Sequence, residues 1–258
     1  MPIEIEPDWW KTLFDEIYLL TDARSVCDES LTRREIDVIC QLLPLQTHHA
    51  ILDLCGGQGR HTFELCRRGF RVCTIMDFSK VLIELASATA ERLDYPVTCV
   101  RCDARKTTLD SASFDHVLIL GNSLGYIQDP AADEQIMAEA LRVLRPGGCL
   151  LVDVTDGSIV KNSFMPNSWH EIGDDTIVCR QRELRGNQIR AREVVLSKSN
   201  GLIRDRTYAV RLYDSDSLSE LFRKTGFREI KITRNFSPHQ NDADYGFMNN
   251  RMMVVGRK

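Results

Sequence analysis

Apolar and polar residues follow two different rhythms in the first 155 residues, and the switches between them predict the elements. Five short apolar runs have the length and composition of buried strands: 51–54, 71–76, 97–101, 116–120 and 149–154. Three longer segments carry apolar residues at helical spacing: 61–68, 80–93 and 131–144. Strands that alternate with helices imply a parallel sheet with right-handed crossovers and ligand sites at the carboxyl ends of its strands.

The segments before and after this alternation have different patterns. Two more segments with helical spacing, 8–20 and 31–43, precede the first strand, and Pro44 ends the second of them. After residue 155 three strands follow one another without helices, separated by the hairpin-type turns Arg185-Gly186-Asn187 and Asn200-Gly201: 176–184, 189–199 and 202–213. This pattern predicts a small antiparallel meander inserted after the fifth strand.

The end of the chain returns to the pattern of the main sheet. A last helix is expected to begin at Ser215 or Ser217 and to end near Thr225, with Gly226 after it. Two strands, 228–235 and 251–255, then close the sheet as an antiparallel hairpin around the polar loop 236–248. The expected fold class is therefore α/β: a doubly wound, mostly parallel, seven-stranded sheet with helices on both faces, N-terminal helices and an antiparallel β insertion.

Composition narrows the class of partner. The chain of 258 residues is 43% hydrophobic and 27% charged, with a net charge of −4. This balance argues against an extended nucleic-acid surface. No apolar run reaches the ~18 residues of a membrane span, and the acidic N-terminus lacks the pattern of a signal peptide. We expect a cytoplasmic protein that does not bind membranes; its oligomeric state is left open.

The nine cysteines favour free thiols over a disulfide framework. Their number is odd, and most fall inside predicted strands and helices. The only C-x-x-C, Cys99 and Cys102, lies on a strand, where its two side chains point to opposite faces. We therefore expect no metal site and a reducing compartment.

The first strand runs directly into a turn of small residues. Asp53 is followed by Cys55-Gly56-Gly57-Gln58-Gly59, and a helix begins soon afterwards. Small residues let the backbone approach a ligand closely, and the first turn of a helix offers unpaired N–H groups. The dinucleotide fingerprint G-x-G-x-x-G would need glycine at position 62, where this chain has Thr62.

The turn instead resembles motif I of the class I S-adenosylmethionine (SAM) dependent methyltransferases, an acidic residue followed by G-x-G-x-G. Cys55 stands at the first glycine of this motif, and Gly57 and Gly59 at the others. The cysteine is a departure that matters if the position requires a positive φ. The segment LRVLRPGG followed by CLLVDV also resembles the family's segment before strand five. The resemblance covers residues 45–155 closely.

The resemblance and the spacing together assign ligand roles at the strand ends. Asp77 lies 18 residues beyond Gly59, about where a carboxylate meets ribose hydroxyls. The alternative, a cap for the next helix, suits Ser79 better. Asp103 matches the adenine-binding position, or makes a local turn bond. Arg60 is a partner for the SAM carboxylate, or a solvated surface residue. The predicted cofactor set, in which Leu120 and Asn122 receive the ammonium, is Asp53, Cys55, Gly56, Gly57, Gly59, Arg60, Asp77, Phe78, Asp103, Ala104, Leu120, Gly121 and Asn122.

The resemblance also implies a division of the chain. Residues 1–44 form a helical cover, in which Trp9, Trp10 and Tyr18 belong to a lid or simply pack on the sheet. Residues 45–155 form the SAM-binding Rossmann-like core. Residues 156–213 form an inserted β lid or substrate region, and residues 214–258 complete the core with the last helix and hairpin.

Methyl transfer from a sulfonium is an in-line displacement, so positioning matters more than acid–base chemistry. The sequence shows no unambiguous base. Candidates to position or deprotonate an acceptor are Tyr18, Tyr126, His170 and His239, with Tyr213 as a further tyrosine.

The acceptor is expected to be a small molecule. The loop after the fourth strand reads GNSLGY, not the N/D-P-P-Y of enzymes that methylate exocyclic amines of nucleic acids or glutamine, and no double-Glu loop of arginine methyltransferases is present. An acidic chain with an inserted meander suits a partly enclosed pocket. Two alternatives remain open here: an NAD(P)-dependent oxidoreductase and a non-catalytic SAM-binding protein.

Overall fold

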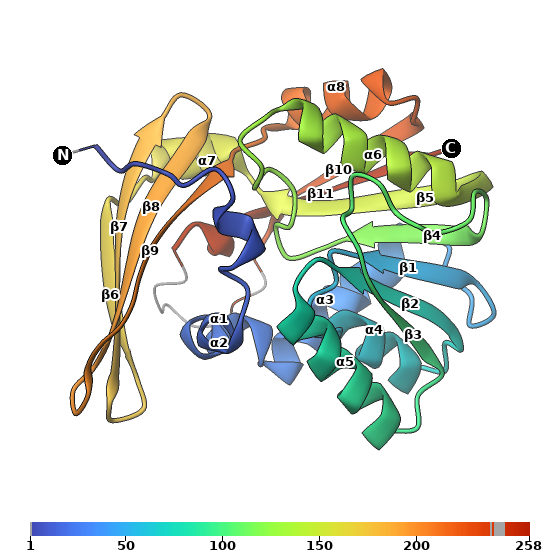
Figure 1. Cartoon of the computed structure of the whole chain (residues 1–258). Helices are drawn as coiled ribbons and strands as arrows, with labels where there is room; N and C mark the ends of the chain where they lie inside the picture. Colours follow the sequence, from blue (N-terminus) through green and yellow to red (C-terminus); the bar gives the residue numbers. More distant parts are fainter. Residues whose placement is uncertain (1, 238, 240–245) are drawn as a thin grey trace.

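A computed structural model describes residues 2–237, 239 and 246–258. The chain forms a seven-stranded sheet of order β10-β11-β5-β4-β1-β2-β3 and a separate four-stranded sheet (Figure 1). In the large sheet only β11 runs antiparallel to its neighbours, which confirms the predicted fold class. Its strands are β1 (Ala50–Leu54), β2 (Val72–Asp77), β3 (Val97–Arg101), β4 (Phe114–Ile119), β5 (Leu144–Thr155), β10 (Arg228–Phe236) and β11 (Arg251–Arg257).

Helices cover both faces of this sheet. Adjacent strand residues point to opposite faces, so Ile51 packs in one apolar cluster and Leu52 in another. The first face carries α3 (Glu29–Leu42), α4 (Arg60–Arg67) and α5 (Lys80–Arg92). The second face carries α6 (Ala131–Val143) and α8 (Ser215–Lys224). The connection between β3 and β4 contains no helix.

Two predicted boundaries need correction, those of β5 and α3, and the predicted start of the last helix is confirmed. Strand β5 begins at Leu144 rather than at residue 149, because Leu144 already pairs with Phe114 across an irregular ladder. Helix α8 begins at Ser215, as predicted, behind the cap Asp214, whose carboxylate accepts from the N–H of Ser217. Helix α3 begins at Glu29 behind the cap Asp28.

The inserted sheet has four strands instead of three. The order is β6 (Asn167–Ile172), β7 (Thr176–Arg185), β8 (Gln188–Ser197) and β9 (Gly201–Arg211), with each pair antiparallel. The short helix α7 (Gly157–Asn162) leads into it. Strand β6 reads NSWHEI and buries little of its surface, so its sequence lacks the apolar alternation by which a strand is recognised.

The prediction of one helix over residues 8–20 is wrong. The chain forms a 3-10 helix, η1 (Trp9–Lys11), and then α1 (Glu16–Thr21) and α2 (Ala23–Val26). Asp15 causes the break, because its extended backbone and its carboxylate, which accepts from the N–H groups of Ile17 and Tyr18, start a new helix. This N-terminal segment, blue in Figure 1, lies between the two sheets.

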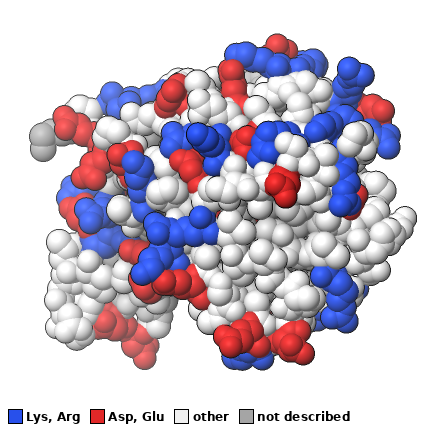
Figure 2. All heavy atoms as spheres, turned by 45° about the vertical axis from the view of Figure 1, so that its right-hand side comes forward, with Lys and Arg blue, Asp and Glu red and all other residues white. Residues whose placement is uncertain are grey.

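Basic and acidic side chains are interspersed on the face shown in Figure 2, with no continuous basic surface there. Within the described parts of the chain, no helix combines the length and apolar character that crossing a membrane requires.

Candidate functional site

A cavity of about 230 Å³ opens at the carboxyl ends of the parallel strands. Residues after β1, β2, β3 and β4 form one side of it, as expected where parallel strands end together. The N-terminal segment and the inner face of the four-stranded sheet form the other sides. Three regions that are distant in sequence therefore enclose one space.

The turn after β1 brings backbone to the edge of the cavity. Gly57 has φ +57°, and Cys55 has φ +63°, which is uncommon for a residue with a side chain and costs about 1–3 kcal/mol. A Cβ on Gly56 would lie 2.7 Å from Cγ of Asp53, so only glycine fits there. Position 55 does require a positive φ, and this chain adopts it with a cysteine.

Asp53 is buried beneath this turn with one oxygen uncommitted. Its Oδ2 accepts from the hydroxyl of Thr62 at 2.8 Å, whereas Oδ1 has no partner among the described residues. Burial raises the pKa of Asp53 to about 6, although the bond from Thr62 opposes this shift. Asp53 borders the cavity, where a cationic ligand group would stabilise its charge.

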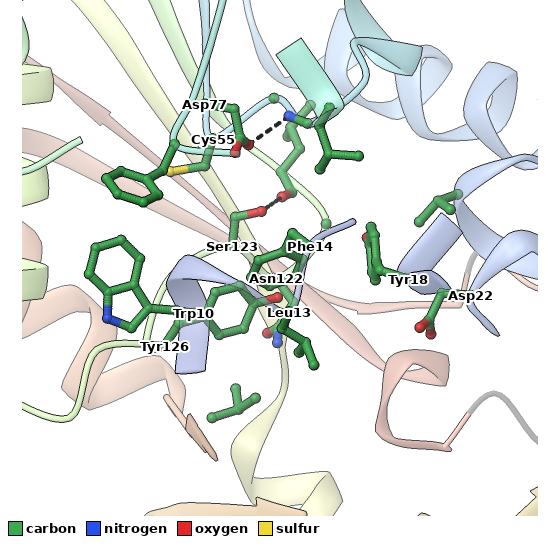
Figure 3. Close-up of a pocket in the computed structure, with 18 of the residues that line it drawn as sticks. Trp10, Leu13, Phe14, Tyr18, Asp22, Cys55, Asp77, Asn122, Ser123 and Tyr126 are labelled. Carbon is green, nitrogen blue, oxygen red and sulfur yellow. Dashed lines mark hydrogen bonds between the residues drawn. The ribbon is translucent and has the colours of Figure 1, made fainter. Parts of the chain in front are cut away.

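Asp77 is fixed at the end of β2. Its Oδ2 accepts from the N–H of Gly57 at 2.9 Å (Figure 3). Its Oδ1 accepts from the N–H of Ser79 at 2.8 Å. Ser79 itself caps α5 through the N–H of Leu82, as predicted. Because a carboxylate has about four acceptor positions, Asp77 can still accept from ligand hydroxyls. Burial raises its pKa despite these bonds.

Asp103 makes local turn bonds, the alternative to its predicted adenine-binding role. It accepts from the backbone N–H of Arg105 at 2.9 Å and from its Nη2 at 2.6 Å. The guanidinium of Arg105 lies 5.3 Å from the ring centroid of Trp10, which meets Phe78 edge-on at 4.8 Å. Aromatic surface and a carboxylate thus lie together after β3, a combination suited to a flat base with an exocyclic amine.

The loop after β4 is held by its own polar groups. The carbonyl of Leu120 accepts from the hydroxyl of Ser123 at 2.7 Å (Figure 3). The side chain of Asn122, whose φ is +64°, accepts from the N–H of Thr155 at 2.9 Å. The amide oxygen of Asn122 is therefore engaged in anchoring the loop to β5.

Arg60 is not a solvated surface residue: it borders the cavity, and its guanidinium is held by a buried carboxylate. It pairs with Glu35 of α3, and Glu35 also accepts from His61 at 2.9 Å and from Arg251 at 2.6 Å. Burial alone would raise the pKa of Glu35, but Arg60, Arg251 and His61 hold it well below its usual value. Burial lowers the pKa of His61 to about 4, so this histidine is neutral at pH 7.

Aromatic side chains crowd the middle of the cavity. The ring of Phe14 lies 5.1 Å from that of Tyr18 and 5.4 Å from that of Tyr126. The ring centroid of Trp9 lies 5.5 Å from that of Tyr126 and 5.8 Å from that of Tyr208. Burial raises the pKa of Tyr18 and of Tyr126, so both hydroxyls stay protonated and can donate hydrogen bonds.

The predicted site residues divide into those that border the cavity and those that lie elsewhere. Every residue of the predicted cofactor set except Gly59 borders the cavity, as do Tyr18 and Tyr126. Gly59 instead serves packing, because a Cβ there would lie 2.4 Å from Cδ1 of Ile75. His170, on β6, and His239 are not among the cavity-lining residues. The hydroxyl of Tyr213, also outside the cavity, donates to Asp133 at 2.5 Å.

Sequence reasoning missed the charged wall opposite the strand ends. Arg180, Arg182, Glu193 and Arg204 of the inserted sheet line the cavity, with Asp22 of the N-terminal segment. The sequence did contain a sign of this wall. In β7 alternate residues share a face, so Arg180 and Arg182 lie on the same face as the buried Val178.

Comparison with known proteins shows which of them this chain resembles. A family model described as a methyltransferase domain matches residues 51–148. The glycine/sarcosine N-methyltransferase of Aphanothece halophytica is 25% identical over 209 residues, covering 78% of this chain and 76% of that protein. The glycine/sarcosine N-methyltransferase of Halorhodospira halochloris is 24% identical over 225 residues, covering 85% and 80%.

A solved structure shows the same fold over nearly the whole chain. It is the crystal structure of an S-adenosylmethionine-dependent methyltransferase from Clostridium acetobutylicum, with a TM-score of 0.73 and 15% identity. The match covers 93% of this chain and 96% of that one, so the likeness includes more than the core that the family model matches.

Proposed function

Because the chain belongs to the class I SAM-dependent methyltransferases, we propose that it transfers a methyl group to a small-molecule acceptor inside this cavity. The main support for a small acceptor is that the cavity is enclosed by the strand ends, the N-terminal segment and the inserted sheet. The named activity of two relatives, N-methylation of glycine and sarcosine, supports an acceptor of this size. Neither an oxidoreductase nor a non-catalytic binder is supported.

The residues present fit SAM at several points. The uncommitted Oδ1 of Asp53 suits its ammonium group, and the remaining acceptor positions of Asp77 suit its ribose hydroxyls. The backbone at Gly56 and Gly57 borders the cavity, where the lack of side chains lets the amino-acid end of SAM approach closely. Phe78 and Asp103 suit the adenine. We assign these residues to the cofactor, and Arg60 to its carboxylate through a pairing shared with Glu35.

The cofactor supplies an activated methyl group. The chain orients the acceptor and excludes water from the cavity. Phe14, Tyr18 and Tyr126 present aromatic faces and protonated hydroxyls with which to orient an acceptor. Alignment of this kind is worth ~7–11 kcal/mol in favourable cases. We propose that residues 1–44 act as a cover that excludes water and that residues 156–213 form the acceptor side. The nine free thiols support a cytoplasmic location.

Cofactor affinity is expected to rise with pH because of Asp53. Its pKa is raised to about 6 in the free protein, and an ammonium ligand favours the ionised form. Below pH 6 binding must first remove a proton, so affinity for S-adenosylhomocysteine should increase about tenfold from pH 5 to pH 7 and then level off.

Calorimetric titration at several pH values measures this dependence. Asp53→Asn should flatten the profile, and Thr62→Val, which removes the hydrogen bond that lowers the pKa, should move its midpoint upward. A profile that Asp53→Asn leaves unchanged would show that another group is responsible.

The function itself is tested with methyl-labelled SAM and cell extract separated into small molecules, RNA and peptides. We expect label in the small-molecule fraction. Label confined to RNA or peptide would overturn the proposed acceptor class.

A further inference from the structure

The inner face of the inserted sheet is charged where it meets the cavity. Arg180 and Arg182 on β7, Glu193 on β8 and Arg204 on β9 all line the space. Their side chains are largely buried: 14% of Arg180, 6% of Arg204 and 4% of Glu193 remain exposed. A strand face that only covered a cavity would be apolar, because buried guanidiniums lose hydration that must be replaced. This face therefore has a role beyond covering.

Glu193 is the carboxylate of this inner face that pairs with Arg180 and Arg204. Glu193 accepts from Nε of Arg180 at 2.8 Å and lies 3.6 Å from Nη1 of Arg204. Arg182 donates to the hydroxyl of Ser168 at 2.9 Å.

The other acidic partners come from the N-terminal segment. Asp22 lies 2.9 Å from Nη2 of Arg180, and Asp15 pairs with Arg204. The aspartates are more exposed than the arginines, at 33% and 32%. Asp15 also caps α1, so of the two aspartates we take Asp22 as the exchangeable partner.

Arg180 and its partner Asp22 both border the cavity, so an anionic group of the acceptor could take the place of Asp22 on Arg180. Asp22 follows Tyr18 by one helical turn and borders the same cavity (Figure 3). Arg182 aligns across the sheet with Ala191 and Tyr208, and Tyr208 belongs to the aromatic group around Trp9. A ligand on the two arginines would therefore extend toward the aromatic side chains and the strand ends.

Resting on the proposed methyl transfer, we infer that the acceptor carries an oxyanion, a carboxylate or a phosphate, bound by Arg180 and Arg182 in exchange for Asp22. Guanidinium groups match both anions through paired N–H donors. The exchange conserves local charge, because one anionic partner of Arg180 replaces another. It also links acceptor binding to release of the N-terminal segment, which Asp22 holds against the sheet.

The test uses the protein saturated with S-adenosylhomocysteine and matched probes. Benzoate and phenyl phosphate distinguish carboxylate from phosphate, and benzamide and phenol are their uncharged counterparts. Probe affinity is measured by calorimetric titration. We expect one or both anions to bind at least tenfold more tightly than their counterparts. Arg180→Gln and Arg182→Gln should each remove most of this preference while retaining affinity for S-adenosylhomocysteine.

Two further variants make the result specific. Asp22→Asn should tighten anion binding, because it removes the competing carboxylate, whereas loss of a purely structural ion pair would weaken it. Arg192→Gln, at an exposed position on β8, is the matched control and should change nothing.

Equal binding of charged and uncharged probes, or an anion preference that survives both arginine variants, would overturn the inference. Methyl transfer to acceptors without an oxyanion would do so too, while leaving the proposed function intact. Absence of any small-molecule methylation alongside arginine-dependent anion binding would instead contradict the proposed function.

Discussion

Replacing Arg251 by methionine is expected to lower the free energy of unfolding by about 3–5 kcal/mol, the usual cost of removing one partner from a buried ionic network. Arg251 begins β11 and is almost fully buried, with 2% of its side chain exposed. Its guanidinium binds both Glu35 and Asp153, whose side chains are 1% and 0% exposed. The variant would leave the buried carboxylate of Asp153 without its cationic partner.

The same network connects α3 to the loop after β4, which borders the cavity. Glu35 belongs to α3, and Asp153 accepts from the N–H of Gly121 at 3.0 Å. Loss of Arg251 should therefore also loosen the loop after β4. Urea unfolding at neutral pH measures the change in stability.

Arg257→Met is the matched control. Arg257 ends the same strand and pairs with Glu229, but the side chains are 51% and 63% exposed. Exposed pairs contribute about 0–1 kcal/mol, so this variant should unfold almost like the parent. If both variants lost the same stability, the loss would come from shortening an arginine on β11 and not from the buried network.

Local patterns were sufficient to predict the sheet and the strand ends. Each of the strands β1 to β5 contains a short apolar run in the sequence, and the residue that ends the run is therefore expected at the carboxyl end of the strand. Asp53, Asp77 and Asp103 could therefore be assigned to one region before any distance was known. The structure places all three at one cavity.

Features that depend on competition or on distant partners could not be predicted in this way. Asp15 ends one helical segment and starts another although apolar spacing continues through it. The ion pair of Glu35 with Arg251 joins residues that lie 216 positions apart in the chain. Sequence spacing contains no information about such pairs.

The charged wall of the inserted sheet is an intermediate case. The alternation in β7 is visible in the sequence, but which face lies inward depends on where the whole sheet docks. Arginines on a half-buried strand usually face solvent. The inward position of Arg180 and Arg182 was therefore the opposite of the ordinary expectation, and such exceptions concentrate at functional sites.

Asp77→Ala is expected to weaken the binding of S-adenosylhomocysteine by about 1.5–3 kcal/mol, or roughly 10- to 150-fold, the range for hydrogen bonds to a charged group. The substitution removes the proposed acceptor of the ribose hydroxyls. It also frees the N–H groups of Gly57 and Ser79, which Asp77 now orders. Both effects act in the same direction, and calorimetric titration at pH 7.5 measures their sum.

Glu91→Ala supplies the comparison, because Glu91 is an exposed residue on α5, the helix that follows Asp77. This variant should bind like the parent. A dissociation constant that Asp77→Ala leaves unchanged would mean that the adenosyl group does not reach the end of β2. The assignments of Asp53 and Asp103 would then fail with it, since all three depend on one ligand spanning neighbouring strand ends.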